Sequence, residues 1–285
     1  MAESDALPPF VSVSWLRRQP APSDGGPVRV DARWSLDGSE GRSTYLQGHV
    51  PGAVFVDLDT VLADPPDREN GRHPLPPPER FARELGALGI PDDVPVVAYD
   101  QGPGGAAARL VWLLRAIGQP AAVLDGGLAA WDGPLSTDPP QRAAVTRRVV
   151  AWPAHRLVDT DEVADLLDVD GVVLLDAREP ARYAGEHEPV DARAGHIPGA
   201  RSAPVTHNLV DGSLRPEDQL RSHYAATGAL DADRVVAYCG SGVAACHDLL
   251  ALETLGVDGQ LYPGSWSAWS ADPSRPAATG HDERG

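Results

Sequence analysis

The chain contains one series of short motifs twice, and this repeat restricts the possible folds more than any other feature of the sequence. Four motifs of the first half return in the same order in the second half: VRVDAR (28–33) as VLLDAR (173–178), GHVPGA (48–53) as GHIPGA (195–200), VVAYD (96–100) as VVAYC (235–239), and DGGLAAW (125–131) as PGSWSAW (263–269). The four offsets are 145, 147, 139 and 138 residues. A nearly constant offset over four matches indicates two copies of one domain.

The repeat divides the 285 residues into parts of ordinary domain size. We expect an N-terminal domain over 8–135, a linker over 136–155 and a C-terminal domain over 156–272. The residues of the linker are rich in Pro, Asp and Arg, with one short strand predicted at 145–152. Residues 273–285 are expected to form a disordered tail.

Within each copy, short β-branched runs alternate with helical patterns. The runs at 94–99 and 234–238 predict buried parallel strands, and the apolar patterns at 106–117 and 243–255 predict the helices that follow them. Such alternation is typical of an α/β architecture, so we expect tandem domains, each a mainly parallel sheet flanked by helices. In these sheets, functional groups gather beyond the carboxyl ends of the strands.

Charge and cysteine content narrow the function classes. The net charge of −17 argues against a nucleic acid or an anionic membrane as partner, because no basic field would attract phosphates. The basic residues are all Arg, so any cation that binds a small anion must be Arg or His. Two Cys residues do not make a disulfide framework, and no segment reads as a signal peptide or a membrane span. We therefore expect a cytoplasmic protein with free thiols.

Cys239 is the strongest candidate for a catalytic residue. It ends a predicted strand and precedes a predicted helix, and Gly240 and Gly242 allow the loop to curl so that several amides point inward. The N-terminus of the following helix adds partial positive charge. This environment favours the thiolate, which is the nucleophilic form of Cys. In the first copy the same position is Asp100, so that copy is expected to be catalytically silent.

These motifs resemble the two-domain rhodanese family, over nearly the whole chain. The loop CGSGVAA (239–245) is most similar to that of 3-mercaptopyruvate sulfurtransferases, whereas thiosulfate sulfurtransferases of the animal type carry cations after the Cys. The resemblance implies a sulfurtransferase that moves sulfane sulfur from a small anionic donor, 3-mercaptopyruvate or thiosulfate, to a thiol, thioredoxin or cyanide. The sulfur would be carried as a Cys239 persulfide, with no metal or organic cofactor.

The resemblance also implies a group that assists the reaction. In the mercaptopyruvate enzymes a Ser at the position of Ser241 is proposed to work with a His and an Asp of the first domain. Here the matching residues are His73 and Asp59, which would polarise Ser241 or protonate the leaving enolate. The first domain would thus supply both residues and one wall of an interdomain cleft.

Donor binding is expected at an Arg and at the loop itself. Arg182 matches the substrate-binding Arg of the family, and its planar fork suits a carboxylate. The loop residues predicted to bind the donor are Gly240, Gly242, Val243 and Ala244. Members that use mercaptopyruvate often have a second Arg after Glu-Pro. Here Val190 follows Glu188-Pro189, so Arg193 is the candidate substitute.

Three other readings remain open at this stage. Sulfur transfer from thiosulfate to cyanide is the main activity if the lack of a second Arg affects the choice of donor more than the sequence of the Cys239 loop does. A sulfur-carrier or partner-binding module without turnover is the non-enzymatic alternative. A phosphatase loop of the same fold usually carries an Arg near its far end, and 239–246 contains none.

For several residues in or near these motifs we expect a structural role. His49 and His196 are expected to fix the turns of their motifs by hydrogen bonding. Arg33 and Arg178, present in both copies after an Asp, predict structural ion pairs. Cys246 is expected to be buried by packing.

Overall fold

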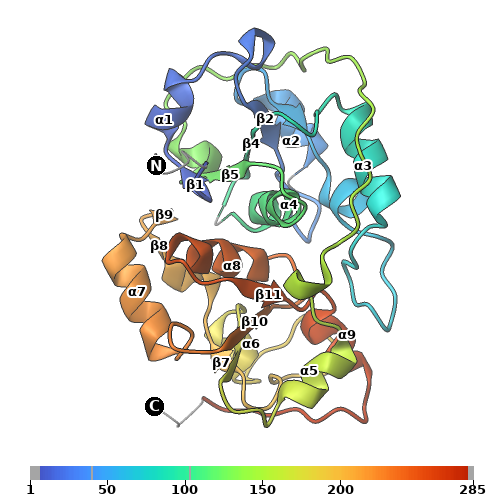
Figure 1. Cartoon of the computed structure of the whole chain (residues 1–285), viewed down its shortest axis with the longest axis vertical. Coiled ribbons are helices and arrows are strands. Elements are labelled where there is room, and N and C mark those ends of the chain that lie inside the picture. Colours follow the sequence, from blue (N-terminus) through green and yellow to red (C-terminus); the bar gives the residue numbers. More distant parts are fainter. Residues whose placement is uncertain (1–6, 40, 103, 282–285) are drawn as a thin grey trace, which may run out of the picture. The chain divides into compact units, whose positions relative to one another are not determined.

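The computed structural model describes residues 7–39, 41–102 and 104–281 and contains two compact units (Figure 1). The first unit holds the chain up to Leu62 together with Pro76–Trp152. The second holds Ala63–Leu75 together with the chain from Pro153 onward. The second unit is therefore built from two separate stretches of sequence.

The first unit is a five-stranded parallel sheet with helices packed on it. The strands follow the order β1 (Phe10–Val11), β5 (Ala121–Leu124), β4 (Val96–Tyr99), β2 (Val28–Asp31) and β3 (Val54–Phe55). The helices are α1 (Val13–Arg18), α2 (Arg42–Gln47), α3 (Pro78–Ala87) and α4 (Gly105–Ala116), and short helical turns lie at Pro22–Asp24, Leu58–Leu62 and Gly127–Ala130.

The second unit repeats this plan with a four-stranded parallel sheet. Its strand order is β11 (Gly259–Leu261), β10 (Arg234–Tyr238), β6 (Val172–Asp176) and β7 (Arg201–Ser202), and β8 (Leu209–Val210) and β9 (Ser213–Leu214) form a separate antiparallel pair. The helices are α5 (Thr160–Leu166), α6 (Pro180–Tyr183), α7 (Glu217–Ala226), α8 (Ala245–Thr254) and α9 (Ser265–Ala271), with short turns at Ala154–Arg156 and Val205–Asn208.

Burial on both faces explains the apolar runs of the central strands. All four residues of β4 are buried, as are Val235–Tyr238 of β10, because helices cover both sides of a parallel sheet. The helices α4 and α8 directly follow these strands and pack on them. The predicted tandem α/β fold with mainly parallel sheets is confirmed. The helix predicted from residue 243 begins at Ala245, since Gly242 has a φ of +74° and keeps the preceding residues in a loop.

The two copies share hydrogen bonds as well as topology. In the first, His49 Nδ1 lies 2.8 Å from the Tyr45 carbonyl oxygen, and the two rings stack at 4.1 Å. In the second, His196 Nδ1 lies 2.8 Å from the Tyr183 carbonyl oxygen, with stacked rings at 3.8 Å. The prediction that these histidines fix their turns is confirmed.

The predicted ion pairs are also present in both copies. Arg33 donates to both carboxylate oxygens of Asp31 and to the Gly48 carbonyl. Arg178 donates in the same way to Asp176 and to the carbonyl of residue 195. Each pair is buried, and each ties the end of a strand to the GHxPGA turn.

The predicted strand at 145–152 is absent from the described structure. Residues 136–152 belong to the first unit, where this stretch is fixed mainly by side chains. Arg147 donates to the carbonyls of Ile90 and Pro91 and to Gln119 Oε1. Within 145–152, one backbone–backbone hydrogen bond is described, from Val145 N to the Gly86 carbonyl, and a strand ladder would need several.

The expectation of disorder is wrong for residues 273–281, which pack against the second unit. Ala278 exchanges two backbone hydrogen bonds with His196, at 2.8 and 2.9 Å. Trp269 Nε1 donates to the Pro276 carbonyl at 2.7 Å. This extended segment covers the GHIPGA turn, a contact between distant parts of the sequence that local composition does not encode.

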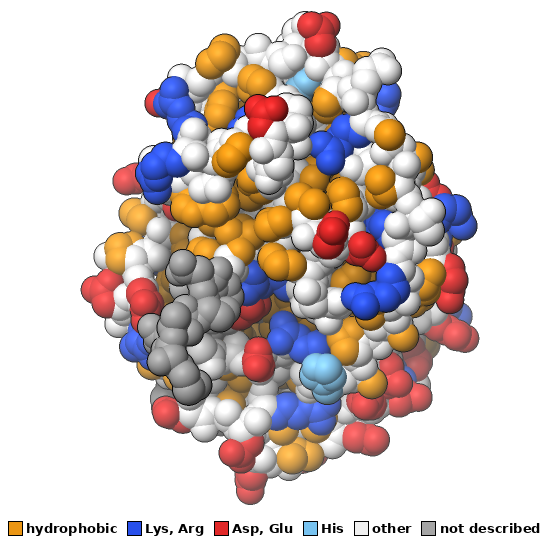
Figure 2. Space-filling view, turned by 45° about the horizontal axis from the view of Figure 1, so that its top comes forward, with side chains coloured by type: hydrophobic (Ala, Val, Ile, Leu, Met, Phe, Trp, Pro, Cys, Tyr) orange, Lys and Arg blue, Asp and Glu red, His pale blue; other side chains and the backbone are white. Residues whose placement is uncertain are grey.

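Figure 2 shows how charged side chains are distributed over one face of the molecule. On the face shown in Figure 2, Arg side chains stand among Asp and Glu side chains. This mixture accords with the strongly negative net charge. Within the described residues, no helix has both the length and the apolarity needed to cross a membrane.

Candidate active site

Cys239 lies directly after the last residue of β10, at the carboxyl edge of the second sheet. Its side chain is buried. The backbone is fixed on both sides, since Cys239 N donates to Ser265 Oγ (3.1 Å) and its carbonyl accepts from Trp266 N (3.0 Å). The thiol therefore has a defined position above the sheet.

The loop after Cys239 leaves backbone amides without internal partners. The N–H groups of Gly240, Ser241, Val243 and Ala244 make no hydrogen bond to the residues that the structure describes. They precede the N-terminus of α8, a helix of 10 residues. Amides and helix end together form a cradle that would stabilise a negative charge on sulfur.

The equivalent loop of the first unit contains its own anion. Asp100 follows β4, and its carboxylate accepts hydrogen bonds from the amides of Gly102 (3.2 Å), Gly104 (3.1 Å) and Ala107 (3.2 Å). Its carbonyl accepts from Leu128 N, as that of Cys239 accepts from Trp266 N. Burial raises the pKa of Asp100 to about 6, although these amides oppose the shift. The amides of this loop thus donate to a carboxyl group of the loop itself.

Ser241 and His73 form the next part of the site. Ser241 Oγ lies 2.7 Å from His73 Nδ1, and both residues are buried. The pair is suited to pass a proton to or from a group above Cys239. Sequence reasoning placed His73 in the first domain, but it lies in 63–75, which belongs to the second unit.

The segment Ala63–Leu75 is held on α9 by contacts spread along its length. Arg68 donates to the Ala271 carbonyl (2.9 Å), and Arg72 N donates to Ser267 Oγ (3.1 Å). Gly71, with a φ of +84°, lies against Gly264, where a Cβ would come within 2.6 Å of the Gly264 carbonyl oxygen. We call this segment the strap. The strap explains why Arg72 and His73, which are far from Cys239 in the sequence, lie next to the loop that follows Cys239.

Arg182 lies over the loop, as expected. The guanidinium donates to Glu188 Oε1 (2.7 Å) and Asp191 Oδ2 (2.9 Å), and its Nη1 is 3.4 Å from where a Cβ on Gly240 would be. Arg72 lies closer still, with Nη2 at 2.9 Å from that point. Sequence reasoning missed Arg72. Its adjacency to His73 was the available signal.

Arg193, the expected second donor-binding cation, is engaged elsewhere. Its guanidinium donates to four backbone carbonyls at the end of α9 and beyond it, those of Trp269, Ser270, Asp272 and Arg275. The last carbonyls of a helix have too few backbone donors, so Arg193 supplies further hydrogen bonds at the end of α9. The structure does not bring its guanidinium to the Cys239 loop.

Two further predicted residues have simple surroundings. Asp59 lies in the first unit with an exposed side chain that accepts a hydrogen bond from Trp34 Nε1 (3.0 Å), so its part in the reaction stays a prediction. Cys246 is fully buried, and its Sγ lies 3.4 Å from the Gly242 carbonyl oxygen. The packing prediction for Cys246 is confirmed.

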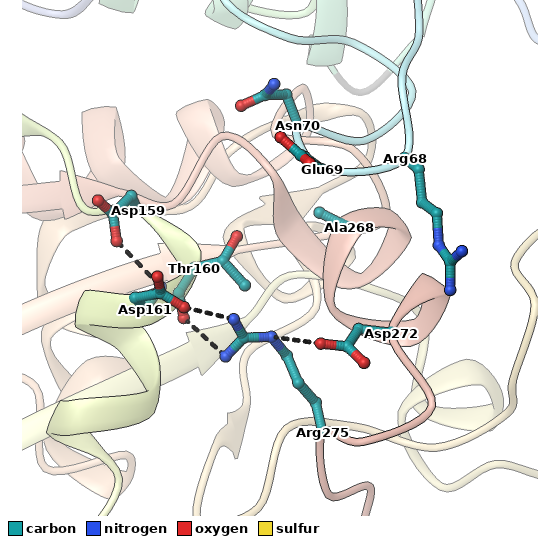
Figure 3. A pocket seen from close by; sticks show the side chains of 9 residues that line it. All are labelled: Arg68, Glu69, Asn70, Asp159, Thr160, Asp161, Ala268, Asp272 and Arg275. Carbon is teal, nitrogen blue, oxygen red and sulfur yellow. Dashed lines mark hydrogen bonds and ion pairs between the residues drawn. The ribbon is translucent and has the colours of Figure 1, made fainter.

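A separate pocket of about 600 Å³ lies elsewhere in the second unit. Figure 3 shows its lining, with Arg275 between Asp161 and Asp272. Arg275 pairs with those carboxylates at 2.5 and 3.5 Å. None of the predicted catalytic residues lines this pocket, so the chemistry is assigned to the Cys239 loop.

Comparison with known proteins identifies the family of the chain. The rhodanese-like domain model matches residues 13–133 and again 159–272. A Pseudomonas aeruginosa protein provisionally named a 3-mercaptopyruvate sulfurtransferase is 45% identical over 88% of this chain and 92% of its own. A Mycobacterium tuberculosis protein provisionally named a thiosulfate sulfurtransferase is 43% identical, over 90% of this chain and 92% of its own.

A solved structure gives the same result for the fold. SseA from Escherichia coli, a 3-mercaptopyruvate sulfotransferase, superposes with a TM-score of 0.75 at 34% identity, covering 91% of this chain and 99% of that one. Both copies match the domain model, and the second carries Cys239 directly after β10. The chain therefore belongs to the rhodanese family, as a tandem-domain sulfurtransferase.

Proposed function

We propose that this sulfurtransferase takes sulfane sulfur from 3-mercaptopyruvate, carries it as a persulfide on Cys239, and passes it to a thiol or to cyanide. The observation that carries the proposal is the loop after β10, where a positioned Cys is followed by backbone amides that have no hydrogen-bond partner among the described residues. The names of the relatives include both mercaptopyruvate and thiosulfate as donors.

The first half-reaction charges the enzyme. The Cys239 thiolate attacks the donor sulfur, a new S–S bond forms, and the donor's C–S bond breaks. The electron pair leaves with the enolate of pyruvate, which takes a proton delivered by Ser241 and His73 to become pyruvate. The loop amides stabilise the negative charge of the resulting persulfide.

The second half-reaction restores the thiol. The acceptor, as thiolate or cyanide, attacks the outer sulfur of the persulfide, and the S–S bond breaks with its electron pair returning to Cys239. The acceptor leaves as a persulfide or as thiocyanate. Dividing the transfer into two steps is covalent catalysis, and each step is an ordinary displacement at sulfur.

Thiosulfate is the second candidate donor. Val190 stands where the mercaptopyruvate enzymes often have an Arg, and Arg193 is occupied at the end of α9. In favour of mercaptopyruvate, Gly240 and Ser241 supply no cation after the Cys. The preferred donor is the one with the higher kcat/KM.

The proposal is tested by mass spectrometry of the protein after treatment with each donor. We expect a gain of one sulfur atom on Cys239 and loss of that sulfur on addition of cyanide, with multiple turnovers. Cys239→Ser should remain unmodified, and Cys246→Ser should be modified as the wild type is. A folded wild-type protein that gains no sulfur from either donor contradicts the proposal. Charging without turnover identifies a carrier.

A further inference from the structure

Each loop amide without a hydrogen-bond partner among the described residues follows a carbonyl that does accept a hydrogen bond. These amides are those of Gly240, Ser241, Val243 and Ala244. A trans peptide group is planar, so its C=O and the N–H of the next residue point in opposite directions. No cis peptide bond occurs among the described residues. A donor that binds the carbonyl on one side therefore turns the following amide to the other side.

The first turn of α9 orients two of these peptide groups. The carbonyl of Cys239 accepts a hydrogen bond from Trp266 N (3.0 Å), and the carbonyl of Gly240 accepts one from Ser267 N (2.9 Å). Both donors are main-chain groups of one helical turn. The N–H groups of Gly240 and Ser241 are therefore turned away from α9.

Cys246, in the first turn of α8, orients the other two peptide groups. Its backbone N–H donates to the carbonyl of Val243 (3.2 Å), and its thiol donates to the carbonyl of Gly242, with Sγ 3.4 Å from the oxygen. The N–H groups of Val243 and Ala244 are therefore turned away from these contacts. Cys246 is fully buried, so water does not compete for its thiol. One of its two bonds to the loop thus comes from the side chain.

The silent loop shows where an amide at the position of Val243 points. Gly104 precedes Val243 by the same 139 residues that separate Asp100 from Cys239. The N–H of Gly104 donates to the carboxylate of Asp100 at 3.1 Å. By the repeat, the N–H of Val243 is directed at the side chain of Cys239.

The two copies orient this amide by different means. In the silent copy the carboxylate of Asp100 attracts the amides, and the residue at the position of Cys246 is Ala107, whose methyl group cannot donate. In the second copy the negative charge arises only when the thiol ionises or the persulfide forms, so the amide must be oriented beforehand. Gly242, with a φ of +74°, gives its peptide group more rotational freedom than another residue would. A hydrogen bond to the Gly242 carbonyl opposes that rotation.

We propose that Cys246 is a positioning residue for sulfur transfer, whose thiol holds the Gly242 carbonyl and so keeps the N–H of Val243 aimed at the sulfur of Cys239. The proposal rests on the function given above and adds a residue to it. Amides that are already oriented stabilise a negative charge without having to turn during the reaction. The charge lies on the thiolate before the donor is attacked and on the persulfide afterwards.

A matched pair of variants separates this role from packing. Cys246→Ser keeps a donor for the Gly242 carbonyl and Cys246→Ala removes it, while the two side chains fill nearly the same volume. Both variants leave Cys239 as the single Cys of the chain, which contains two. Iodoacetamide is uncharged and reacts with the thiolate, so its rate reports the charge on sulfur and not anion binding. At one neutral pH, we expect Cys246→Ala to react about 3- to 10-fold more slowly than Cys246→Ser, the effect of losing an ordinary hydrogen bond.

Sulfur transfer should follow the same order. With the donor that the wild type prefers, kcat of Cys246→Ala should lie about 3- to 10-fold below that of Cys246→Ser, with little change in KM, because a fully buried residue binds no donor. Thermal unfolding checks that both variants fold. Equal iodoacetamide rates and equal kcat values in the two folded variants overturn the proposal. If the wild type accepts neither donor, the proposed function fails, while the iodoacetamide rates still decide the role of Cys246.

Nuclear magnetic resonance of isotope-labelled protein observes the amide itself. In Cys246→Ser, the amide proton of Val243 should move downfield as the Cys239 thiol ionises, because it faces the charge. The amide proton of Val236, within β10, serves as the control and should move much less. In Cys246→Ala the response of Val243 should be smaller. A Val243 signal that does not respond in Cys246→Ser, or that responds equally in both variants, overturns the proposal.

Discussion

The hydrogen bond between Ser241 Oγ and His73 Nδ1 predicts different effects on the two donors. Cleavage of 3-mercaptopyruvate releases an enolate, which is a strong base and requires a proton. Thiosulfate releases sulfite, a much weaker base. Ser241→Ala should therefore lower kcat/KM for 3-mercaptopyruvate by roughly 10²- to 10³-fold and change that for thiosulfate far less. Steady-state kinetics with both donors measures the difference.

The double variant provides the control for this pair. If Ser241 and His73 act as one unit, Ser241→Ala combined with His73→Asn should cost little more than either change alone. Equal losses with both donors would show that the pair supports the loop and does not move a proton.

Asp100 predicts a pH dependence of stability in the silent loop. Burial raises its pKa to about 6, above the value of 3.8 for an exposed Asp. Between these values the folded protein binds more protons than the unfolded chain, so this contribution to stability is present at low pH and is lost as pH rises through 6. From about pH 4.5 to about pH 7.5, we expect a loss on the order of 2 kcal/mol.

Asp100→Asn isolates this contribution because an amide does not titrate. The difference in free energy of unfolding between wild type and variant, from urea denaturation, should move in favour of the variant as pH rises. A difference that stays constant with pH would mean that the amides of Gly102, Gly104 and Ala107 hold the carboxylate at its ordinary pKa.

At the scale of elements, the strap is the part of the fold on which the site depends most. Gly71 has a φ of +84°, and a Cβ there would meet Ser267 Oγ and the Gly264 carbonyl. Gly71→Ala should push the strap off α9 and displace Arg72 and His73. We expect kcat/KM to fall roughly 10- to 100-fold, since small displacements of catalytic groups have effects of this size.

Gly256→Ala is the matched control for the strap. Gly256 also has a positive φ, of +81°, but nothing lies within 4 Å of the added Cβ. Both variants incur the backbone cost of Ala in a left-handed conformation, about 1 kcal/mol. Both variants should unfold at a lower temperature than the wild type, but only Gly71→Ala should also lose activity. Similar losses in both would assign the effect to backbone strain.

The sequence contained enough information to predict the elements near Cys239. The run at 234–238 forms β10 with the expected bounds, and the glycines after Cys239 form a loop because their position between strand and helix is a local property. The strap could not be predicted in this way. Its attachment to α9 depends on contacts between Gly71 and residues almost 200 positions later, and no local pattern encodes them.

The predicted role of Arg193 failed for the same physical reason. Its motif position suggested donor binding, but its four hydrogen bonds are to carbonyls that follow it by 76 to 82 positions. The charge of an Arg is visible in a sequence, whereas the groups that satisfy it are set by tertiary packing. Arg72 shows the converse, since a residue without a motif of its own reaches the loop through the strap.

At the scale of the whole molecule, the second unit consists of two stretches of chain that are far apart in sequence. The strap leaves the first unit after Leu62 and returns to it at Pro76, so a cut between Trp152 and Pro153 would leave the strap on the first fragment. The strap is an integral part of the second unit, through its bonds to α9 and Ser241. The two fragments of a chain cleaved there should therefore stay associated.

This prediction can be checked by inserting a specific protease site after Trp152. After cleavage we expect both fragments in a single peak on size-exclusion chromatography, with sulfur transfer retained because Arg72 and His73 remain at the loop. The same cleavage in the Gly71→Ala chain should weaken the association and reduce activity, because that change loosens the strap. Arg68→Gln, which removes one exposed contact of the strap to the Ala271 carbonyl, should weaken it less. If the cleaved wild type separates into two folded fragments, the contacts between the strap and the rest of the second unit are too weak to hold the fragments together.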